Sequence, residues 1–175
     1  MKILENKDIK LRALEPSDIE ILYKWENDED SWEVSNTNTP FSRYILQKYL
    51  DNAYRDIYEN KELRLVIASK ETDEAVGLID LFDFDPFHSR AGVGILVAEQ
   101  KHRRLGYGKQ ALECLINYSF GLLKIHLLYC NISASNKSSI SLFSSLGFEK
   151  AGIKKDWSRT MYGREDEYYF QIISL

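Results

Sequence analysis

Cysteine is scarce in this sequence, with 2 residues among 175. Cys114 and Cys130 lie far apart and lack the C-x-x-C spacing of a redox or metal site. Two such residues exclude a disulfide-stapled secreted fold, and both fall inside a predicted helix or strand. We therefore expect buried, reduced thiols, as is typical of a cytoplasmic protein.

Long apolar runs and an excess of positive charge are also missing. No stretch approaches the about 18 uninterrupted apolar residues of a membrane span, and the first residues, which include Glu5, form no apolar run of signal-peptide length. The formal net charge of −4 gives no general attraction to nucleic acid. His88, His102 and His126 are dispersed and suggest no metal site. We expect neither nucleic acid, membrane nor metal as a partner.

The length and composition are those of one domain with a full core. Hydrophobic residues make up 44% of the chain, and no linker, repeat or low-complexity tract interrupts residues 1–175. Hydrophobic periodicity predicts an α+β fold. The predicted strands cover about 9–14, 63–69, 75–84, 93–97, 126–132, 148–153 and 167–173, and the predicted helices cover about 19–25, 42–59, 107–119 and 136–146. A polar loop is expected at 35–39.

The order of these elements limits the topology. Strands 63–69, 75–84 and 93–97 follow one another through short connections, which favours antiparallel pairing. The helix that begins near 107 separates strand 93–97 from strand 126–132, and this β-α-β crossover predicts a parallel pair.

The stretch from Ala91 to Gly108 carries the strongest chemical signal. Its strand, Val93–Val97, runs into the basic turn Arg103-Arg104-Leu105-Gly106-Tyr107-Gly108, which opens a helix. Glycines let backbone N–H groups approach a ligand closely, and a helix N-terminus carries partial positive charge and unpaired donors. The turn therefore predicts a cradle for the phosphates of a cofactor, with a plain tight turn as the alternative.

Two common phosphate-binding motifs do not fit this turn. A P-loop needs glycine where Arg103 stands and Ser or Thr where Gln110 stands. A dinucleotide fingerprint needs a third glycine and a position directly after the first strand of a Rossmann unit. Neither requirement is met.

Two motifs resemble those of the GCN5-related N-acetyltransferases (GNAT). Arg103-x-x-Gly106-x-Gly108 is similar to the family signature Q/R-x-x-G-x-G/A, and the segment Asn136–Phe148, NKSSISLFSSLGF, resembles its block N-x-x-S/A-x-x-L-Y-x-x-x-G-F. The order and spacing match, and the resemblance covers most of residues 11–175. Segments 76–81 and 87–91 are similar to the spermidine (polyamine) N-acetyltransferases and the ribosomal-protein N-terminal acetyltransferases.

The resemblance implies a fold and a co-substrate. The fold is a mixed, mostly antiparallel sheet of six to seven strands with helices on both faces, in which strands four and five are parallel and splayed. The co-substrate is acetyl-CoA, without a metal. Its pantetheine arm would pair with the main chain of Leu96, Val97 and Ala98, which splaying leaves without strand partners. Asn136, which can equally cap a helix, would contact the same arm.

The resemblance also places the pyrophosphate on the basic turn. It would lie on the N–H groups of Arg103, Arg104, Leu105, Gly106, Tyr107, Gly108 and Lys109. The side chains of Arg103, Arg104 and Lys109 would donate to phosphate oxygens, for which the arginine fork is well shaped.

The implied reaction is direct attack of an amine on a thioester, so the amine must be neutral. An alkyl amine with a pKa near 10.4 is uncharged in roughly one molecule in 2,500 at pH 7. Among Asp80, Asp83 and Asp85, similarity with the polyamine branch favours Asp83 as the carboxylate that faces the amine. It would bind the cation and pass protons through water, unless it is merely solvated.

Phe143 departs from the family pattern within the cofactor-binding block. It stands where many relatives have a Tyr thought to protonate the CoA thiolate, and a phenyl ring cannot do so. Its spacing with Ile140 and Leu146 is also typical of core packing. A thiol pKa of about 8.5 makes the thiolate a tolerable leaving group, and we expect Ser144 to supply the proton. The other candidates are water and the hydroxyls of Tyr107, Tyr129 and Ser141.

The acceptor site departs as well. Polyamine relatives carry adjacent acids before the proline that starts the second helix, but here Asn38 and Thr39 precede Pro40. The acidic run 26–30 lies further back, either as a solvated helix end or as a steering site for a cationic amine. Specificity is expected in the loops 31–40 and 157–165. Tyr44, Trp157 and Tyr162 either line the mouth or pack at an edge.

Three functions remain open. The first is an acetyl-CoA-dependent N-acetyltransferase for the primary amine of a small molecule, with polyamines as one class. The second is the same chemistry on a protein N-terminus, as in the ribosomal branch. The third is a CoA-binding module without catalysis, which Phe143 permits. By analogy with the family we expect a homodimer.

Overall fold

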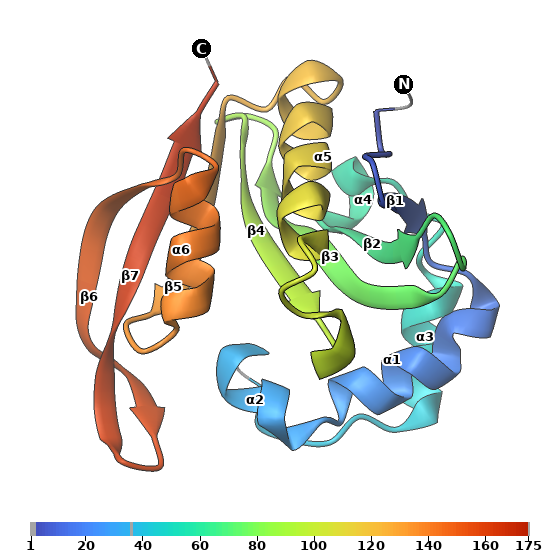
Figure 1. Ribbon diagram of the computed structural model, residues 1–175, viewed down its shortest axis with the longest axis horizontal. Helices are drawn as coiled ribbons and strands as arrows, with labels where there is room; N and C mark the ends of the chain where they lie inside the picture. Colours follow the sequence, from blue (N-terminus) through green and yellow to red (C-terminus); the bar gives the residue numbers. More distant parts are fainter. Residues whose placement is uncertain (1–2, 36, 175) are drawn as a thin grey trace.

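The computed structural model describes residues 3–35 and 37–174 and contains a seven-stranded sheet. The strands are β1 (Ile9–Ala13), β2 (Leu63–Ser69), β3 (Ala75–Asp85), β4 (Arg90–Val97), β5 (Leu127–Ser133), β6 (Glu149–Thr160) and β7 (Gly163–Ile173). Their order in the sheet is β1-β2-β3-β4-β5-β7-β6, and β4 and β5 run parallel while the other neighbours are antiparallel (Figure 1). The predicted α+β fold and the parallel pairing of the fourth and fifth strands are confirmed.

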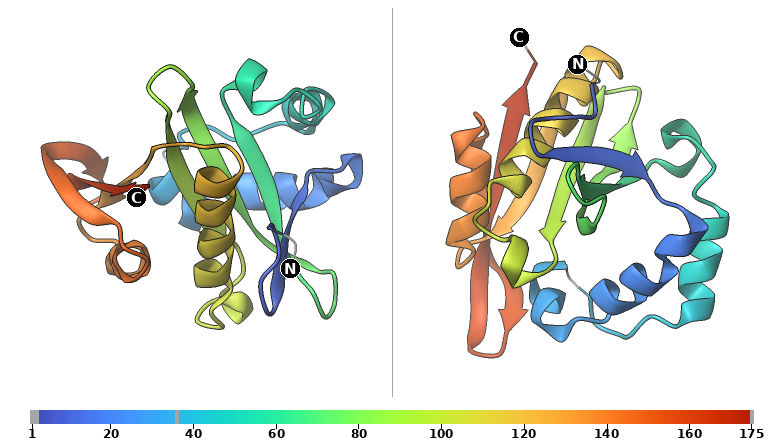
Figure 2. Two further views of the ribbon diagram at one scale, coloured as in Figure 1. Left: turned by 90° about the horizontal axis from the view of Figure 1, so that it is seen from above. Right: turned by 45° about the vertical axis from the view of Figure 1, so that its right-hand side comes forward.

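Helices cover both faces of this sheet. They are α1 (Ile19–Glu26), α2 (Glu29–Ser35), α3 (Arg43–Asp51), α4 (Ile57–Asn60), α5 (Tyr107–Gly121) and α6 (Lys137–Ser145), with 3-10 turns at Pro16–Asp18 and Gln100–His102. Figure 2 shows α5 and α1 on opposite sides of the strands. Within the described ranges, no helix is both long and apolar enough to cross a membrane.

The alternation of side chains along the strands divides the core in two. Ile79 and Leu81 of β3 pack in the cluster that contains Leu112 of α5. Leu78 packs instead with Leu22 of α1 and with residues of α3. In the regular stretch 78–82 of β3, the side chains that share the parity of Leu78 therefore face α1 and α3, and this face carries the polar residues described below.

Two predicted segments differ from the structure. The predicted helix 42–59 is two helices, because the side chain of Asp56 accepts hydrogen bonds from the N–H groups of Tyr58 and Glu59 and so starts α4 anew. The helical spacing of apolar residues continues from α3 into α4, so it does not reveal the break, which depends on the Asp56 cap. The segment 157–165, predicted as a loop, is mostly strand at the end of the β6–β7 hairpin.

Around residue 35 the prediction was partly wrong. Helix α2 occupies residues 29–35 of the stretch that was expected to form a loop and a solvated helix end. Asn36, inside the predicted polar loop 35–39, lies outside the described residues.

The parallel pair β4–β5 is short, and the two strands then separate. Residues Arg90–Gly92 pair with Leu127–Tyr129, and the register ends there although both strands continue. In Figure 1 the distance between β4 and the β5–β7–β6 part grows toward the end where α2 lies. This is the predicted splay.

Candidate active site

A cleft of about 750 Å³ lies where β4 and β5 diverge. Residues 93–96 of β4 form one side and residues 130–133 of β5 the other. Asn136, Ser139 and Phe143 line it from α6. The remaining walls come from α1 to α3, from β2 and β3, and from the β6–β7 hairpin. The cleft therefore joins segments from most of the chain.

The turn before α5 has the geometry of an anion cradle. Gly106, the N-cap residue of α5, has φ +82°, a left-handed conformation that costs other residues about 1 kcal/mol or more, and no side chain caps the helix there. At Gly108 a Cβ atom would lie 3.5 Å from Val97 and 3.7 Å from Leu142, so the first turn of α5 packs closely against β4 and α6. The helix N–H donors and the free edge of β4 fit a cofactor that combines a pyrophosphate with an amide-containing arm.

The three basic side chains of this turn do not share one role. Arg103 donates from Nε to the Val97 carbonyl at 3.2 Å and from Nη2 to the Ala98 carbonyl at 3.4 Å. It therefore ties the turn to the end of β4. Arg104, at φ 63°, and Lys109 are exposed, and both have the freedom to reach a phosphate.

Asn136 caps α6 and faces the cleft at the same time. Its Oδ1 accepts a hydrogen bond from the N–H of Ser139 at 3.1 Å, and its side chain lines the cavity. Its side-chain amide is thus held in one orientation at the cleft wall by the helix it starts.

Phe143 packs in the core and lines the cleft. The residue is 3% exposed, and its ring meets the Phe148 ring at a centroid distance of 5.0 Å. Ser144, the predicted proton donor, is exposed and does not line the cleft. Residues 136, 139 and 143 are three and four apart and so share the inward face of α6, while Ser144 lies about 100° round the helix. The hydroxyl-bearing side chain of α6 in the cleft wall is that of Ser139.

The aspartate that reaches the cleft is Asp80 rather than the predicted Asp83. Asp83 has φ 48° in an irregular part of β3, where the register shifts between Phe82 and Asp85, and it is exposed. There, burial of Tyr129 and the nearby Asp83 carboxylate raise the pKa of the Tyr129 phenol. Asp80 has the parity of Leu78 and lines the cavity.

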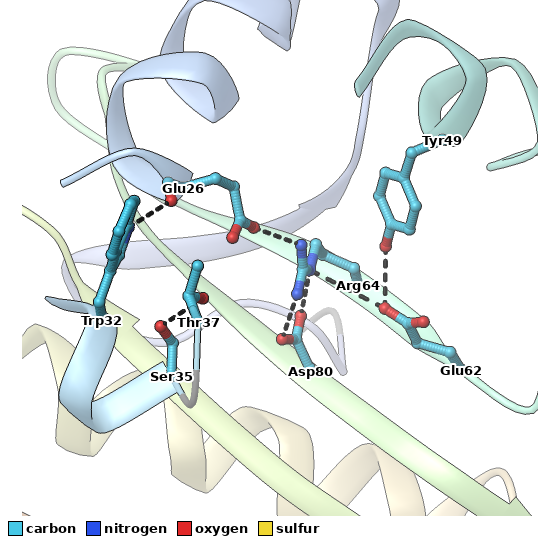
Figure 3. A network of polar contacts seen from close by, with 8 residues as sticks. All are labelled: Glu26, Trp32, Ser35, Thr37, Tyr49, Glu62, Arg64 and Asp80. Carbon is cyan, nitrogen blue, oxygen red and sulfur yellow. Dashed lines mark hydrogen bonds and ion pairs between the residues drawn. The ribbon is translucent and has the colours of Figure 1, made fainter. Parts of the chain in front are cut away.

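Asp80 belongs to a polar cluster on the wall formed by α1, α3, β2 and β3. Arg64 faces it across the β2–β3 register and donates from Nε and Nη2 to its two oxygens at 2.8 and 2.9 Å. Arg64 Nη1 donates to Glu26 Oε1 at 2.7 Å, and Glu62 Oε1 lies 4.0 Å from Nε. The Tyr49 hydroxyl donates to Glu62 Oε1 at 2.9 Å (Figure 3).

The cluster fixes the charge of its arginine. Burial works against the guanidinium, but the neighbouring Asp80 and Glu26 carboxylates outweigh it and raise the pKa of Arg64. Burial, with Glu62 nearby, also raises the pKa of the Tyr49 phenol. Near neutral pH the cluster therefore contains a guanidinium and an un-ionised phenol.

The opposite wall carries a second ion pair. Lys154 Nζ donates to Glu167 Oε1 and to Asn131 Oδ1, both at 2.9 Å, and lies 4.8 Å from the centre of the Trp157 ring. Of the three aromatic residues for which both places were left open, Trp157 lines the cleft, whereas Tyr44 and Tyr162 are exposed outside its lining. The part of the chain that the structure describes has no group of three His, Cys, Asp or Glu side chains able to hold a metal ion.

The sequence-based prediction missed Arg64, Glu62 and Lys154. The sequence did contain a signal for Arg64. It is two residues from buried Val66, and Asp80 is likewise two residues from buried Leu78, so both charged residues occupy inward-facing positions of their strands. A charged residue at an inward-facing strand position needs a partner, and these two provide one for each other.

Comparisons with known proteins agree with this geometry. Residues 8–149 match the family model described as an acetyltransferase (GNAT) domain. A spermidine N(1)-acetyltransferase from Vibrio cholerae is 24% identical over 147 residues, which cover 84% of this chain and 82% of that protein. The [Ribosomal protein bS18]-alanine N-acetyltransferase of Escherichia coli is 34% identical over 71 residues, 41% of this chain and 47% of that protein.

The fold is shared with a solved structure. The crystal structure of spermidine N-acetyltransferase from Vibrio cholerae in complex with CoA and spermine matches with a TM-score of 0.85 at 22% identity, over 96% of each chain. Since the family model also spans most of the chain, the protein belongs to the GNAT family of acetyltransferases and is an N-acetyltransferase that uses acetyl-CoA.

Proposed function

We propose that the acceptor is the primary amine of a small cationic molecule of the di- or polyamine class. One observation carries this proposal: the charged side chains that line the cleft are four acids, Glu26, Glu62, Asp80 and Glu167, against two bases, Arg64 and Lys154. An excess of carboxylates in a confined cleft attracts ammonium groups. The relative from Vibrio cholerae is named for spermidine, and its solved complex contains spermine, which supports the same class.

We propose the same contacts to acetyl-CoA that were expected from the sequence, except that Arg103 holds the turn. Bound acetyl-CoA supplies a thioester whose carbonyl carbon an amine can attack. The main chain of Leu96, Val97 and Ala98 pairs with the pantetheine arm, and the Asn136 amide contacts it across the cleft. Backbone N–H groups of residues 103–109 hold the pyrophosphate, with Arg104 and Lys109 as side-chain donors, while Phe143 forms the apolar wall beside the arm.

Asp80 replaces Asp83 as the carboxylate that orients the amine. It pairs in register with Gly94, two residues beyond the last parallel pair of β4 and β5, and a Cβ atom at Gly94 would lie 3.8 Å from Asp80 Oδ2. A carboxylate beside an ammonium raises the amine pKa, so Asp80 binds the cation and the proton leaves through water. The departing thiolate takes its proton from water or from the Ser139 hydroxyl.

The test is CoA release from acetyl-CoA, followed with a thiol reagent against polyamines, amino acids, aminoglycosides and short peptides. Release with diamines or polyamines, and a large loss in the Asp80→Asn variant, supports the proposal. Release with peptides alone assigns the protein to N-terminal acetylation. Acetyl-CoA binding without release on any acceptor contradicts the proposal and favours a CoA-binding module.

We propose a cytoplasmic location and self-association for the same protein. The two cysteines are buried and unpaired, which suits a reducing compartment. A solved dodecameric form of the Vibrio cholerae enzyme is known, and light scattering on the purified protein measures whether this chain also assembles.

A further inference from the structure

The guanidinium of Arg64 lies among the carboxylates of the polar cluster in the cleft wall. Arg64 is contacted by Asp80 of β3, by Glu26 of α1 and by Glu62, the residue just before β2. An ammonium group of a bound amine would seek the same carboxylates. The guanidinium thus occupies a position that the proposed substrate could otherwise fill.

The charges of the cluster can be counted. Three carboxylates and one guanidinium give a net charge of −2, and without Arg64 the net charge would be −3. Arg64 cannot lose its proton near neutral pH, because a guanidinium is charged far above it and its neighbours hold it in that form. The cleft therefore keeps this positive charge at every pH near neutrality.

The hydrogen bonds limit which carboxylates remain available. Each oxygen of Asp80 accepts one hydrogen bond from Arg64 and keeps a lone pair with which it can still bind the amine. Glu26 uses Oε1 for Arg64, and Glu62 uses Oε1 for the Tyr49 hydroxyl. The second oxygen of each glutamate is also left for an ammonium, which makes two further positions, one on either side of the guanidinium.

Arg64 also forms part of the end wall of the cleft. Tyr49, Glu62 and Arg64 line both the cleft and a smaller pocket of about 270 Å³, so these side chains separate the two spaces. The Tyr49 ring lies 5.4 Å from the guanidinium carbon of Arg64. A long acceptor would meet this wall.

We propose that Arg64 is a specificity-determining residue, a built-in counter-ion that matches the cleft to an acceptor with two positive charges and disfavours acceptors with three or four. This inference rests on the proposed function, since it concerns the choice among amines. It selects diamines over longer, more highly charged polyamines. The effect acts on KM, because it changes how well the charged acceptor binds and leaves the reacting atoms alone.

A ladder of charge variants tests the inference. The wild type has a cluster charge of −2, Arg64→Gln has −3, Asp80→Asn has −1, and the double variant Arg64→Gln/Asp80→Asn returns to −2. The measured quantity is the ratio of kcat/KM for 1,4-diaminobutane to that for spermidine. Because the ratio compares two acceptors on one enzyme, a loss of turnover common to both cancels.

The expected ratios follow the charge. The wild type prefers the diamine, Arg64→Gln shifts the ratio about tenfold toward spermidine, and the double variant returns it toward the wild-type value, because the additional positive charge of spermidine interacts with the net charge of the cluster. Arg64→Lys, which keeps the cation and limits the risk of misfolding, retains the wild-type preference. Arg43→Gln is the matched control, because it removes an arginine paired with Glu20 outside the cleft lining, and it leaves the ratio unchanged.

Two results would overturn the inference. One is an unchanged ratio in folded Arg64→Gln that still binds acetyl-CoA with wild-type affinity. The other is a double variant that behaves like Arg64→Gln alone, which would show that the arginine acts by shape. A wild type that binds acetyl-CoA but acetylates no amine contradicts the proposed function itself, and this result is seen before any variant is made.

Discussion

The Phe143 ring meets the Phe148 ring edge-on, with centroids 5.0 Å apart and ring planes at 89°. Both rings are buried, and Phe143 also forms part of the cleft wall. The position where many family members carry a tyrosine is therefore a core position that borders the reaction space. The side chain that packs in the core is therefore the same one that departs from the family pattern.

Replacing Phe143 by tyrosine would place a phenol where the ring borders the cleft. We expect Phe143→Tyr to raise kcat, by about tenfold, because a general acid for the thiolate commonly contributes 10² to 10⁴ and the thiolate already leaves tolerably well. The pH profile of kcat should gain an alkaline limb near the tyrosine pKa of about 10. Phe143→Leu is the control and brings no gain. An unchanged profile with intact acetyl-CoA binding would mean that protonation of the thiolate does not limit the rate.

The two glycines of the basic turn should respond differently to alanine. Gly106 has φ +82°, so Gly106→Ala should lower the free energy of unfolding by about 1 kcal/mol. Gly108 lies inside α5, and its nearest neighbours would contact a Cβ atom at ordinary distances of 3.5 to 3.8 Å. Gly108→Ala should therefore keep or slightly raise stability, since alanine is the better helix former.

Urea unfolding of both variants checks this difference. The KM for acetyl-CoA should rise in both if backbone N–H groups of this turn hold the pyrophosphate, because a methyl group there restricts the approach of the ligand. A normal KM in both variants would contradict the cradle.

Asn136 allows its two roles to be separated. Asn136→Ala removes the cap of α6 and should cost about 1 kcal/mol of stability, and it should also raise the KM for acetyl-CoA. Asn136→Asp keeps an oxygen that accepts the Ser139 N–H, so stability should stay near the wild type. The aspartate has no amide N–H to donate, so its KM for acetyl-CoA should rise nevertheless. A wild-type KM in Asn136→Asp would leave the cap as the residue's whole role.

Most of the fold could be predicted from residue patterns. Strand β2 was expected with the observed bounds, Leu63–Ser69, because its apolar run is bounded by polar residues. Gly147 has φ +91° just after α6, the left-handed conformation that is typical of a glycine at the end of a helix. The break before α4 could not be found from apolar spacing, since Leu46, Leu50 and Ile57 keep a helical spacing across it. The new helix begins where it does because Asp56 caps it.

The candidate site was predictable where its residues follow one another in the chain. The turn 103–109 and the start of α6 are local motifs, and the structure places both beside the split strands. The pairing of Arg64 with Asp80 joins two strands, so it depends on register, which a single sequence does not give. Asp83, which was predicted to face the amine, lies outside the cleft lining for a related reason, because the irregularity after Phe82 changes which residues face inward.

The two thiols should be silent toward thiol reagents in the folded protein. Burial raises the pKa of Cys130 to about 12, and burial together with Glu113 raises the pKa of Cys114 to about 11. At pH 8 roughly one Cys130 in ten thousand is a thiolate, and the thiolate is the reactive form. The native protein should therefore add little background to the CoA-release assay, whereas the unfolded chain should release two equivalents of colour.

The same shift predicts how stability depends on pH. The folded pKa of Cys130 lies above the unfolded value of about 8.5, so its contribution to stability is full below pH 8.5 and is lost as pH rises toward the folded value. The difference in unfolding free energy between the wild type and Cys130→Ala should shrink between pH 8.5 and 11, by up to about 1.4 kcal/mol per pH unit. Denaturant unfolding across this range measures it. A constant difference, or rapid labelling of the native protein at pH 8, would show that the Cys130 side of the cleft opens to solvent.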